Sequence, residues 1–435
     1  MVELKRMLMP MEERLIIHNF AGIKSIEIEI NKINIIIGPQ ASGKSVCAKL
    51  LFFFKSFVWH IVATVENDAS KRNLDSSYKQ KFQEYFPPEF WDVNTFLLRY
   101  EIGDSFIEIS RKEGDMSKVT LTYSDLYKSF LRDLRVVNKK VKESMSEGSV
   151  RASFAIPRDI LSEYLGFVLS PKLPRQAGFT QLFIPAGRSF FANLQNSIFS
   201  FLSSSDALDP FLIEFGKLYE GYKNVRLRRP ARADKSTGAK DYQEEAERLI
   251  EKVICGKHVR IKGSDYLDSP DGRRVSLSNS SSGQQETLPL AIILSILPTI
   301  ASRVGKTVYI EEPEAHLFPE AQRTIVELIA LTFNQSKNNL QFVVTTHSPY
   351  VLTALNNLLQ AGLLYESLDG DRLLSLQTVM PQFKTLEPKD ISAYAFMAGG
   401  CSTIVEPETG LIDASIIDSV SDILAIEFDA LIGID

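Results

Sequence analysis

Residues 33–45 read INIIIGPQASGKS. The first five residues are mostly β-branched and apolar, as expected of a strand buried on both faces of a parallel sheet. They run directly into Gly38–Ser45, which matches the pattern G-x-x-x-x-G-K-[ST] at every fixed position. The stretch Val46–Phe57 then predicts a helix. Strand, glycine loop and helix in this order are the context that a phosphate-binding loop requires.

In such a loop the backbone N–H groups surround a β-phosphate, the lysine neutralises β/γ charge and the last hydroxyl ligates Mg²⁺. We therefore predict ATP and Mg²⁺ as cofactors. The alternative is a glycine turn without a ligand, which would not need the buried strand before it. The residues predicted to bind ATP are Gly38, Gln40, Ala41, Ser42, Gly43, Lys44, Ser45 and Val46, with Ser45 also on the metal.

A second apolar strand, Val308–Glu312, ends in two adjacent carboxylates. Parallel strands deliver the residues at their carboxyl ends to the edge of the sheet where ligands bind. We expect Glu311 to hold the metal and Glu312 to polarise the attacking water as the catalytic base. The alternative is an acidic first turn of the next helix, which also favours negative charge.

Two further motifs follow the same logic. Ser281–Gln285 precedes an apolar helix and predicts a clamp for the γ-phosphate held by another subunit, made by Ser281, Ser282, Gly283 and Gln284. Alone, the same residues would be a serine-rich helix cap. His347 ends the apolar strand Gln341–Thr346, where we expect a catalytic contact to the γ-phosphate instead of a purely structural histidine.

Other candidates carry weaker signals. His316 is expected near an interface between subunits, and Arg188 at the nucleotide edge. Asp369-Gly370-Asp371 resembles a metal-binding pair but is better interpreted as a hairpin turn. The stretch Arg226–Lys240 is expected to be a mobile, solvated loop, with nucleic-acid contact as the alternative. Its basic residues are Arg226, Arg228, Arg229, Arg232, Lys235 and Lys240.

Composition limits the function classes. The chain has 435 residues, a net charge of −5 and three widely spaced cysteines. These values indicate a large core, no general attraction to nucleic acid and no disulfide framework. The first residues do not form a signal peptide, and the apolar run Leu288–Ile300 is too short to span a bilayer. We expect a cytoplasmic protein without a membrane partner.

The pattern along the chain predicts an α/β fold of two lobes with a modest helical insertion. Residues 1–123 would form lobe I, with the phosphate loop and an antiparallel meander over Phe96–Tyr123. Residues 124–254 would form the mainly helical insertion with a core strand near 182–185. Residues 255–400 would form lobe II, and 401–435 a tail.

The order of the four motifs resembles the ABC-type ATPase heads of the SMC, Rad50, RecF and overcoming-lysogenization-defect class. Ile310–Leu317 and Thr345–Pro349 carry most of this resemblance, which covers residues 14–60 and 275–430. Two departures concern the metal carboxylate, Glu311 where aspartate is usual, and the clamp, where Ser280 and Ser282 replace leucine and glycine. Both departures would slow hydrolysis.

The resemblance implies that two heads enclose two ATP–Mg²⁺, so it predicts a homo-oligomer. It also implies a subunit of an antiphage system of the PARIS or Septu type, which would control a separate effector, expected to be a nuclease, after a phage-encoded trigger. Only 88 residues follow His347, so we expect no nuclease in the chain itself. The alternatives are a DNA-repair or DNA-maintenance ATPase, a transporter subunit, and a nuclease using Asp369 and Asp371.

Overall fold

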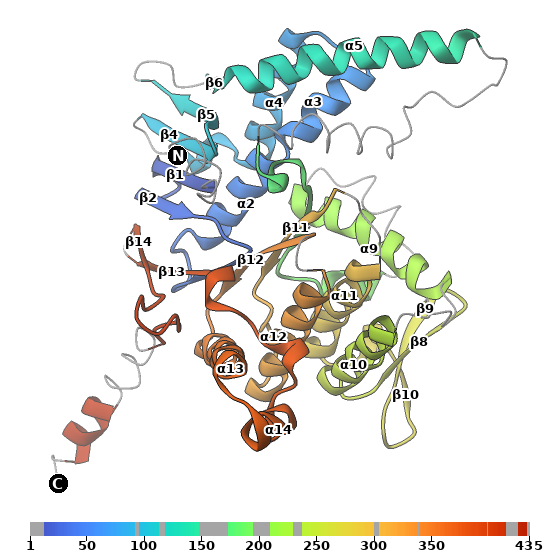
Figure 1. Ribbon diagram of the computed structural model, residues 1–435, viewed down its shortest axis with the longest axis vertical. Helices are drawn as coiled ribbons and strands as arrows, with labels where there is room; N and C mark the ends of the chain where they lie inside the picture. Colours follow the sequence, from blue (N-terminus) through green and yellow to red (C-terminus); the bar gives the residue numbers. More distant parts are fainter. Residues whose placement is uncertain are drawn as a thin grey trace.

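Figure 1 shows the computed structural model of the chain. The structure describes residues 13–91, 95–112, 118–147, 173–194, 209–228, 237–299, 304–336, 339–397, 399–414 and 425–432. Two large sheets and two hydrophobic cores organise this part of the chain, so the predicted two-lobed α/β fold is confirmed.

A six-stranded sheet passes through the middle of the molecule in the order β14-β13-β3-β12-β11-β7. Strands β13 to β7 pair in parallel, and β14 pairs antiparallel with β13 at one edge. The carboxyl ends of five strands therefore meet at one edge. The five parallel strands are β3 (Ile33–Ile37), β7 (Thr180–Ile184), β11 (Lys306–Glu311), β12 (Leu340–Thr346) and β13 (Ile391–Met397), and the sixth strand is β14 (Gly400–Thr403).

A second, antiparallel sheet forms lobe I in the order β2-β1-β4-β5-β6. Strands β4 and β5 alternate between buried and half-buried residues, which confirms the predicted meander over 96–123. The strands are β1 (Glu13–Phe20), β2 (Ile23–Glu29), β4 (Phe96–Ile102), β5 (Ser105–Arg111) and β6 (Thr120–Tyr123).

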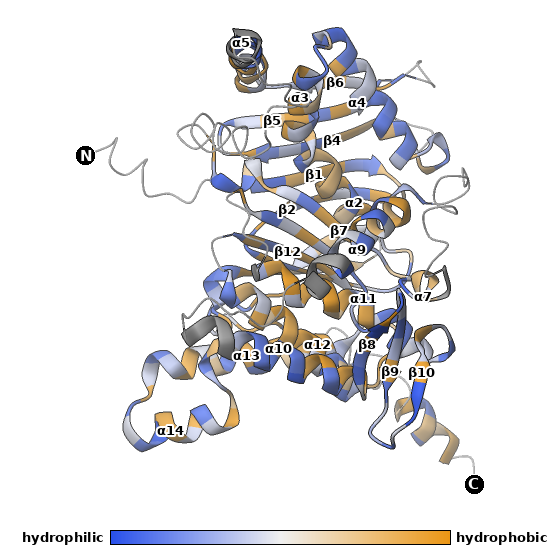
Figure 2. Cartoon of the chain, turned by 90° about the vertical axis from the view of Figure 1, so that its right-hand side faces the viewer, coloured by the Kyte–Doolittle hydropathy of each residue, from blue (hydrophilic) through white to orange (hydrophobic). Residues whose placement is uncertain are grey.

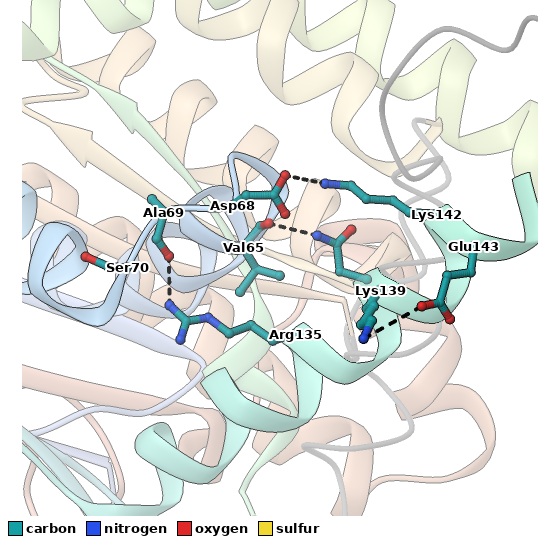
Figure 3. A pocket seen from close by; sticks show the side chains of 9 residues that line it. Val65, Asp68, Ala69, Ser70, Arg135, Lys139, Lys142 and Glu143 are labelled. Atoms are coloured by element: carbon teal, nitrogen blue, oxygen red, sulfur yellow. Dashed lines mark hydrogen bonds and ion pairs between the residues drawn. The ribbon is translucent and has the colours of Figure 1, made fainter. Parts of the chain in front are cut away.

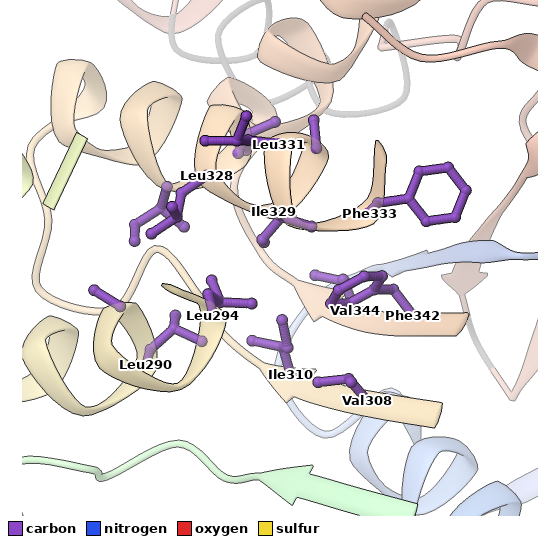
Figure 4. Close-up of a cluster of buried hydrophobic side chains, with 14 of the residues drawn as sticks. Leu290, Leu294, Val308, Ile310, Leu328, Ile329, Leu331, Phe333, Phe342 and Val344 are labelled. Atoms are coloured by element: carbon purple, nitrogen blue, oxygen red, sulfur yellow. The ribbon is translucent and has the colours of Figure 1, made fainter. Parts of the chain in front are cut away.

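The central sheet separates the two cores. Ile35 belongs to the lobe II core and its neighbour Ile36 to the lobe I core, because successive side chains of a strand point to opposite faces. Both faces are covered, which explains the continuous apolar pattern of β3. Figure 4 shows the lobe II side, where Leu294 of α11 and Leu328 of α12 lie over Ile310 and Val344 of the sheet.

Helices cover both faces of this sheet (Figure 1). The lobe I core contains side chains of α2 (Lys44–Lys55), α3 (Phe57–Glu66) and α4 (Lys71–Tyr85). It also contains side chains of α5 (Asp125–Glu147), which the sequence assigned to the insertion. The other helices are α7 (Phe190–Leu194), α9 (Pro210–Arg228), α10 (Thr237–Val253), α11 (Ser282–Ile296), α12 (Pro319–Gln335), α13 (Pro349–Ser367) and α14 (Gly370–Val379). Figure 2 shows much of α11 in the colour of hydrophobic residues, and every residue from Leu288 to Leu294 is buried, as expected of a helix inside a core.

A three-stranded sheet, β10-β9-β8, leads into α11. Its strands are β8 (Lys257–Ile261), β9 (Ser264–Asp268) and β10 (Arg274–Ser276). Short 3-10 helices connect other elements: η1 (Pro88–Phe90), η2 (Arg175–Gly178), η4 (Leu277–Asn279), η5 (Leu297–Thr299), η6 (Gln382–Lys384) and η7 (Pro388–Asp390).

One stretch of the described chain, Lys44–Glu66, is long and apolar enough to cross a membrane by composition. It is longer than Leu288–Ile300, the run singled out from the sequence. In the structure it forms α2 and α3, and 67% of its apolar window is buried within the protein. Phe53, Phe54 and Phe57 of this stretch are fully buried in the lobe I core, so the protein itself accounts for the apolar composition.

Several predicted elements differ from the structure. Asp369–Asp371 is not a hairpin turn, because Gly370 begins α14 and the apolar residues on both sides are helical. The expected loop Arg226–Lys240 is helical at both ends, in α9 and α10, and its middle lies outside the described residues. The helix predicted from Val46 begins at Lys44. The proposed boundary at 400/401 falls inside β14.

Candidate nucleotide site

Three predicted motifs meet at the carboxyl edge of the central sheet. The glycine loop follows β3, Glu312 follows β11 and His347 follows β12, and these three strands are neighbours in the sheet. They line one cavity of about 510 Å³. The residues that line it are Ala21, Gly22, Gln40, Ala41, Ser42, Gly43, Lys44, Ser45, Val46, Glu89, Phe90, Trp91, Glu312 and His347.

The glycine loop is shaped to leave backbone donors free. Gly43 has φ +96°, a left-handed conformation that other residues rarely adopt, and a Cβ there would lie 2.7 Å from the Ile23 side chain. Gly43 precedes α2 and supplies no side-chain cap. The first N–H groups of α2 are therefore available to an anion, which the positive end of the helix also attracts.

Lys44 reaches into this loop from the first turn of α2. Its ammonium donates hydrogen bonds to the carbonyls of Gly38, at 2.8 Å, and Pro39, at 2.7 Å. Burial lowers the pKa of Lys44, and the nearby carboxylates of Glu312 and Glu314 oppose that shift. A buried ammonium held by loop carbonyls is poised to exchange them for phosphate oxygens.

A polar chain joins Lys44, His347 and Glu312. Lys44 Nζ lies 3.4 Å from His347 Nδ1, and His347 Nε2 lies 3.0 Å from Glu312 Oε1. An ammonium can only donate, so in the Nε2–H tautomer the His347 ring accepts from Lys44 at Nδ1 and donates to Glu312 at Nε2. This contact holds one carboxylate oxygen of Glu312, a residue that lines the cavity.

Glu314, which the sequence analysis did not single out, supports this arrangement. Its Oε1 accepts hydrogen bonds from the His347 backbone N–H and from the Thr346 hydroxyl, both at 2.7 Å. It therefore fixes the end of β12 against the loop after β11. Glu314 stands within the quoted run Ile310–Leu317, so a carboxylate two residues beyond the base was the available signal.

Glu311 and Ser45 offer the oxygen ligands that Mg²⁺ prefers. Glu311 is 6% exposed, and burial raises the pKa of its carboxyl, while the nearby Ser45 hydroxyl and Lys49 ammonium oppose that shift. Among the described residues its Oε1 has no hydrogen-bond partner. An orphaned carboxylate oxygen beside a hydroxyl fits an ion that prefers oxygen ligands and takes few of them from the protein.

Arg188 does not point at the nucleotide edge, contrary to expectation. It is 0% exposed, and its guanidinium donates to the backbone carbonyls of Glu311 and Glu312 at 2.7 and 3.0 Å. The side chain therefore lies behind the carboxylates, inside the protein. A further partner is Glu286 of α11, an acidic residue that sequence reasoning missed.

The predicted clamp is a capped helix start. The Ser281 hydroxyl accepts from the Gln284 N–H at 3.3 Å, and Gln284 Oε1 accepts from the Ser281 N–H at 3.1 Å, which is a capping box. Ser281 and Ser282 are exposed. None of the residues 281–285, all of them described, lines the cavity that holds Lys44. The structure therefore does not bring the clamp to the glycine loop of the same chain.

Gly283 places the clamp against the loop after Glu312. A Cβ at Gly283 would lie 2.7 Å from the backbone oxygen of His316. His316 is exposed and has φ +60°, so its backbone and not its ring packs against the clamp. The expected position of His316 near a subunit interface stays a prediction.

A second cavity, of about 600 Å³, lies between α5 and the α3–α4 connection (Figure 3). Arg135 donates to the Ala69 carbonyl at 2.7 Å, and Lys142 pairs with Asp68 at 2.6 Å. These contacts hold α5 onto lobe I and carry none of the predicted motifs. The side chains of the basic run Arg226–Lys240 lie outside the described residues.

A family of known proteins matches most of the chain. Residues 33–353 match the family described as "AAA domain, putative AbiEii toxin, Type IV TA system". That span contains the glycine loop, the clamp, both carboxylates and His347, and it covers more than half of the chain.

Two curated proteins match shorter stretches. A probable ATPase of retron Vc95 from Vibrio cholerae serotype O1 biovar El Tor is 30% identical over 109 residues, which is 23% of this chain and 20% of that protein. The DNA replication and repair protein RecF of Psychromonas ingrahamii is 39% identical over 62 residues, or 13% of this chain and 17% of RecF. The chain thus matches at most a fifth of the length of these relatives.

Among solved structures, an SMC head bound to the C-winged helix domain of ScpA aligns with 91% of this chain and 97% of that one, at 13% identity and a TM-score of 0.39. The SMC head domain from Thermotoga maritima aligns with 91% and 98%, at 12% identity and a TM-score of 0.35. The family match, taken with the motif order and the two-lobed fold, confirms the predicted resemblance. The chain belongs to the family described as "AAA domain, putative AbiEii toxin, Type IV TA system".

Proposed function

We propose that two copies of this chain bind and hydrolyse ATP in shared sites. One observation carries the proposal. The glycine loop, Glu312 and His347 line one cavity, whereas the described clamp residues Ser281–Gln285 lie outside it and Ser281 is exposed. Each chain thus offers both parts of a site but does not join them, and a second copy would supply the missing part.

Within one half-site, the side chains have separate tasks. Lys44 and the N–H groups of Gln40–Val46 would bind the phosphates. Glu312 would accept a proton from the attacking water, with His347 holding the orientation of its carboxylate and contacting the γ-phosphate. Ser281 and Gly283 of the partner would bind the same γ-phosphate at the start of α11.

Ser45 and Glu311 would hold Mg²⁺, which supplies charge neutralisation across the β- and γ-phosphates when bound. The orphaned oxygen of Glu311 supports this assignment. Glutamate is one methylene longer than the aspartate expected here. We therefore expect slow hydrolysis, with ATP serving largely as a structural switch for association.

We further propose that this ATPase is a cytoplasmic subunit of an antiphage complex. The family description names an AbiEii toxin, and a local stretch resembles the ATPase of a retron. ATP-dependent association would hold a separate effector, a nuclease, inactive until a phage-encoded signal arrives. The chain itself would have no nuclease activity.

Affinity purification of the tagged chain from its native operon tests this proposal. Wild type and Glu312→Gln would be purified with and without ATP, sized by light scattering, and assayed for nuclease activity in each fraction. The proposal predicts a defined oligomer that copurifies with a nuclease. The amount of bound nuclease should differ between the purifications with and without ATP. A bare oligomer that retains DNA and has no nuclease partner would contradict the effector role.

A second candidate is an ATPase that clamps DNA for maintenance. The local similarity to RecF favours it. It predicts hydrolysis stimulated by DNA and a binding constant that weakens steeply with salt. The same purified oligomer tests both candidates, because the antiphage proposal requires neither effect.

A further inference from the structure

The guanidinium of Arg188 is fully buried between two parts of the ATPase that have different tasks. It follows β7, whose neighbour β11 ends at Glu311 just before Glu312, and it contacts α11, whose first residues form the clamp. Burying an arginine is costly unless its charge and donors are satisfied. Its partners therefore indicate what the residue is for.

Arg188 holds the backbone of the two carboxylate residues. Nη1 donates to the Pro185 carbonyl at 2.9 Å and the Glu311 carbonyl at 2.7 Å, and Nη2 donates to the Glu312 carbonyl at 3.0 Å. The planar fork of an arginine can reach several carbonyls at fixed spacing, which a lysine cannot. The end of β11 is thus fixed from behind.

This support matters most at Glu312. Its φ is +44°, a left-handed conformation that is unfavourable for a residue with a Cβ. The Glu312 N–H donates to the Thr345 carbonyl at 2.9 Å, and its own carbonyl accepts from Arg188. Both polar backbone groups of a strained residue are therefore held, and its carboxylate lies 3.0 Å from His347 Nε2.

The other half of the Arg188 contacts belongs to the clamp helix. Its Nε donates to the Glu286 carbonyl at 3.0 Å. The Glu286 carboxylate, 1% exposed, accepts from the backbone N–H groups of Arg188 at 2.8 Å and Ser189 at 2.7 Å. Glu286 lies in α11 directly after the Ser281–Gln285 segment, so about one helical turn separates it from Ser281.

We propose that Arg188 is a positioning residue that couples the clamp helix to the catalytic base of the same chain. When Ser281 binds the γ-phosphate held by a partner, a shift of α11 reaches Glu312 through Glu286 and Arg188. Binding of ATP at one site then positions the catalytic base Glu312 of the other site. The inference rests on the proposed shared-site ATPase and adds coupling between its two sites.

Arg188→Lys tests the inference, because it keeps the charge and removes the fork. ATP affinity, measured with a fluorescent ATP analogue, should stay within about threefold of wild type, since Lys44 and the glycine loop are untouched. Hydrolysis should fall on the order of 100-fold, the cost of misplacing a catalytic group. The Hill coefficient for ATP should fall from above 1 to 1. Glu286→Gln should give the same pattern more weakly.

Lys384→Gln is the matched control. Lys384 is 4% exposed and pairs with Glu245 at 2.5 Å and Glu327 at 3.0 Å, so it is a buried cation whose described partners lie outside the nucleotide site. This variant should lose thermal stability but keep the wild-type turnover number and Hill coefficient. Thermal unfolding of all variants separates loss of fold from loss of coupling.

The outcomes divide clearly. A wild-type Hill coefficient of 1, or wild-type turnover in Arg188→Lys, would overturn the coupling and leave the ATPase proposal intact. Turnover and ATP binding lost together, in proportion to the unfolded fraction, would show a merely structural arginine. If Arg188→Lys does not fold, Glu286→Gln decides by the same criteria. A wild-type chain that neither binds nor hydrolyses ATP would overturn both proposals.

Discussion

The glycine loop region and the clamp region use hydrogen bonds in opposite ways. In the loop region, Lys44 lines a cavity, Glu311 Oε1 has no hydrogen-bond partner among the described residues, and burial shifts both pKa values against the charged form. In the clamp, Ser281 and Gln284 satisfy each other on an exposed helix start, and no clamp residue is ionisable. The comparison teaches that the loop region is arranged to bind a charged ligand. The clamp has its hydrogen bonds satisfied within its own chain, and in the proposed mechanism it binds phosphate only when a partner supplies the nucleotide.

Lys44→Ala should break the loop region with the largest effect. Removing the only described lysine in the cavity takes away the charge that offsets the phosphates, so ATP affinity should fall on the order of 100-fold. Titration with a fluorescent ATP analogue measures this. Lys71→Ala, a change at an exposed residue of α4, is the control and should bind ATP as wild type does. Equal affinity in both variants would show that the cavity is not the nucleotide site.

Glu312→Gln should separate binding from chemistry. The amide keeps the shape of the side chain but cannot accept a proton, so turnover should fall on the order of 100-fold or more while ATP affinity is retained. The ATP-bound oligomer should persist, which size-exclusion chromatography with light scattering would show. Glu320→Gln, an exposed change in α12, is the control. Turnover unchanged in Glu312→Gln would remove this residue from the mechanism.

The loop region was largely predictable from the sequence. Its strand, glycine loop and carboxylates lie within short segments, and parallel strands bring their carboxyl ends together. The roles of Arg188 and Glu286 were not predictable, because 98 residues separate the two and nothing local marks them as partners. Arg188 was expected at the nucleotide edge only because it follows a buried strand. The end of a strand places a residue at the edge of a sheet, but packing decides which way its side chain turns.

The clamp and the 369–371 segment show a second limit. The capping-box pattern at Ser281 indicates a helix start equally well with or without a phosphate partner, so the sequence left both readings open. At Asp369-Gly370-Asp371 the same turn residues join two helices, α13 and α14, instead of two strands. The same turn residues occur in hairpins and in helix connections. The apolar stretches on both sides were too short to distinguish the two-residue repeat of a strand from the 3.6-residue repeat of a helix.

Ser281→Ala should weaken the clamp without touching the loop region. It removes a helix cap, at a cost of about 1 kcal/mol of stability, and the hydroxyl offered to a partner. Turnover should fall on the order of tenfold, with ATP affinity of the isolated chain unchanged. Ser70→Ala removes the matched cap of α4, where the hydroxyl accepts from the Asn73 N–H at 3.1 Å, and should cost stability alone. Equal turnover in the two variants would leave Ser281 as a cap only.

Gly283→Ala tests the contact between the clamp and the loop after Glu312, with the smallest expected effect. The new methyl group would lie 2.7 Å from the His316 backbone oxygen, so the clamp and this loop must separate by a fraction of an ångström. Alanine also favours the helix, so stability should change little, while turnover falls by roughly three- to tenfold because the two elements no longer move together. Gly221→Ala in α9 is the matched control, since a Cβ there meets no described atom within 4 Å, and it should leave turnover unchanged. Steady-state ATP hydrolysis and thermal unfolding of both variants measure the effect. If Gly283→Ala matches Gly221→Ala in turnover, the close approach of the clamp to residue 316 is packing alone. The clamp would then act on the ATP of the partner without affecting Glu312 of its own chain.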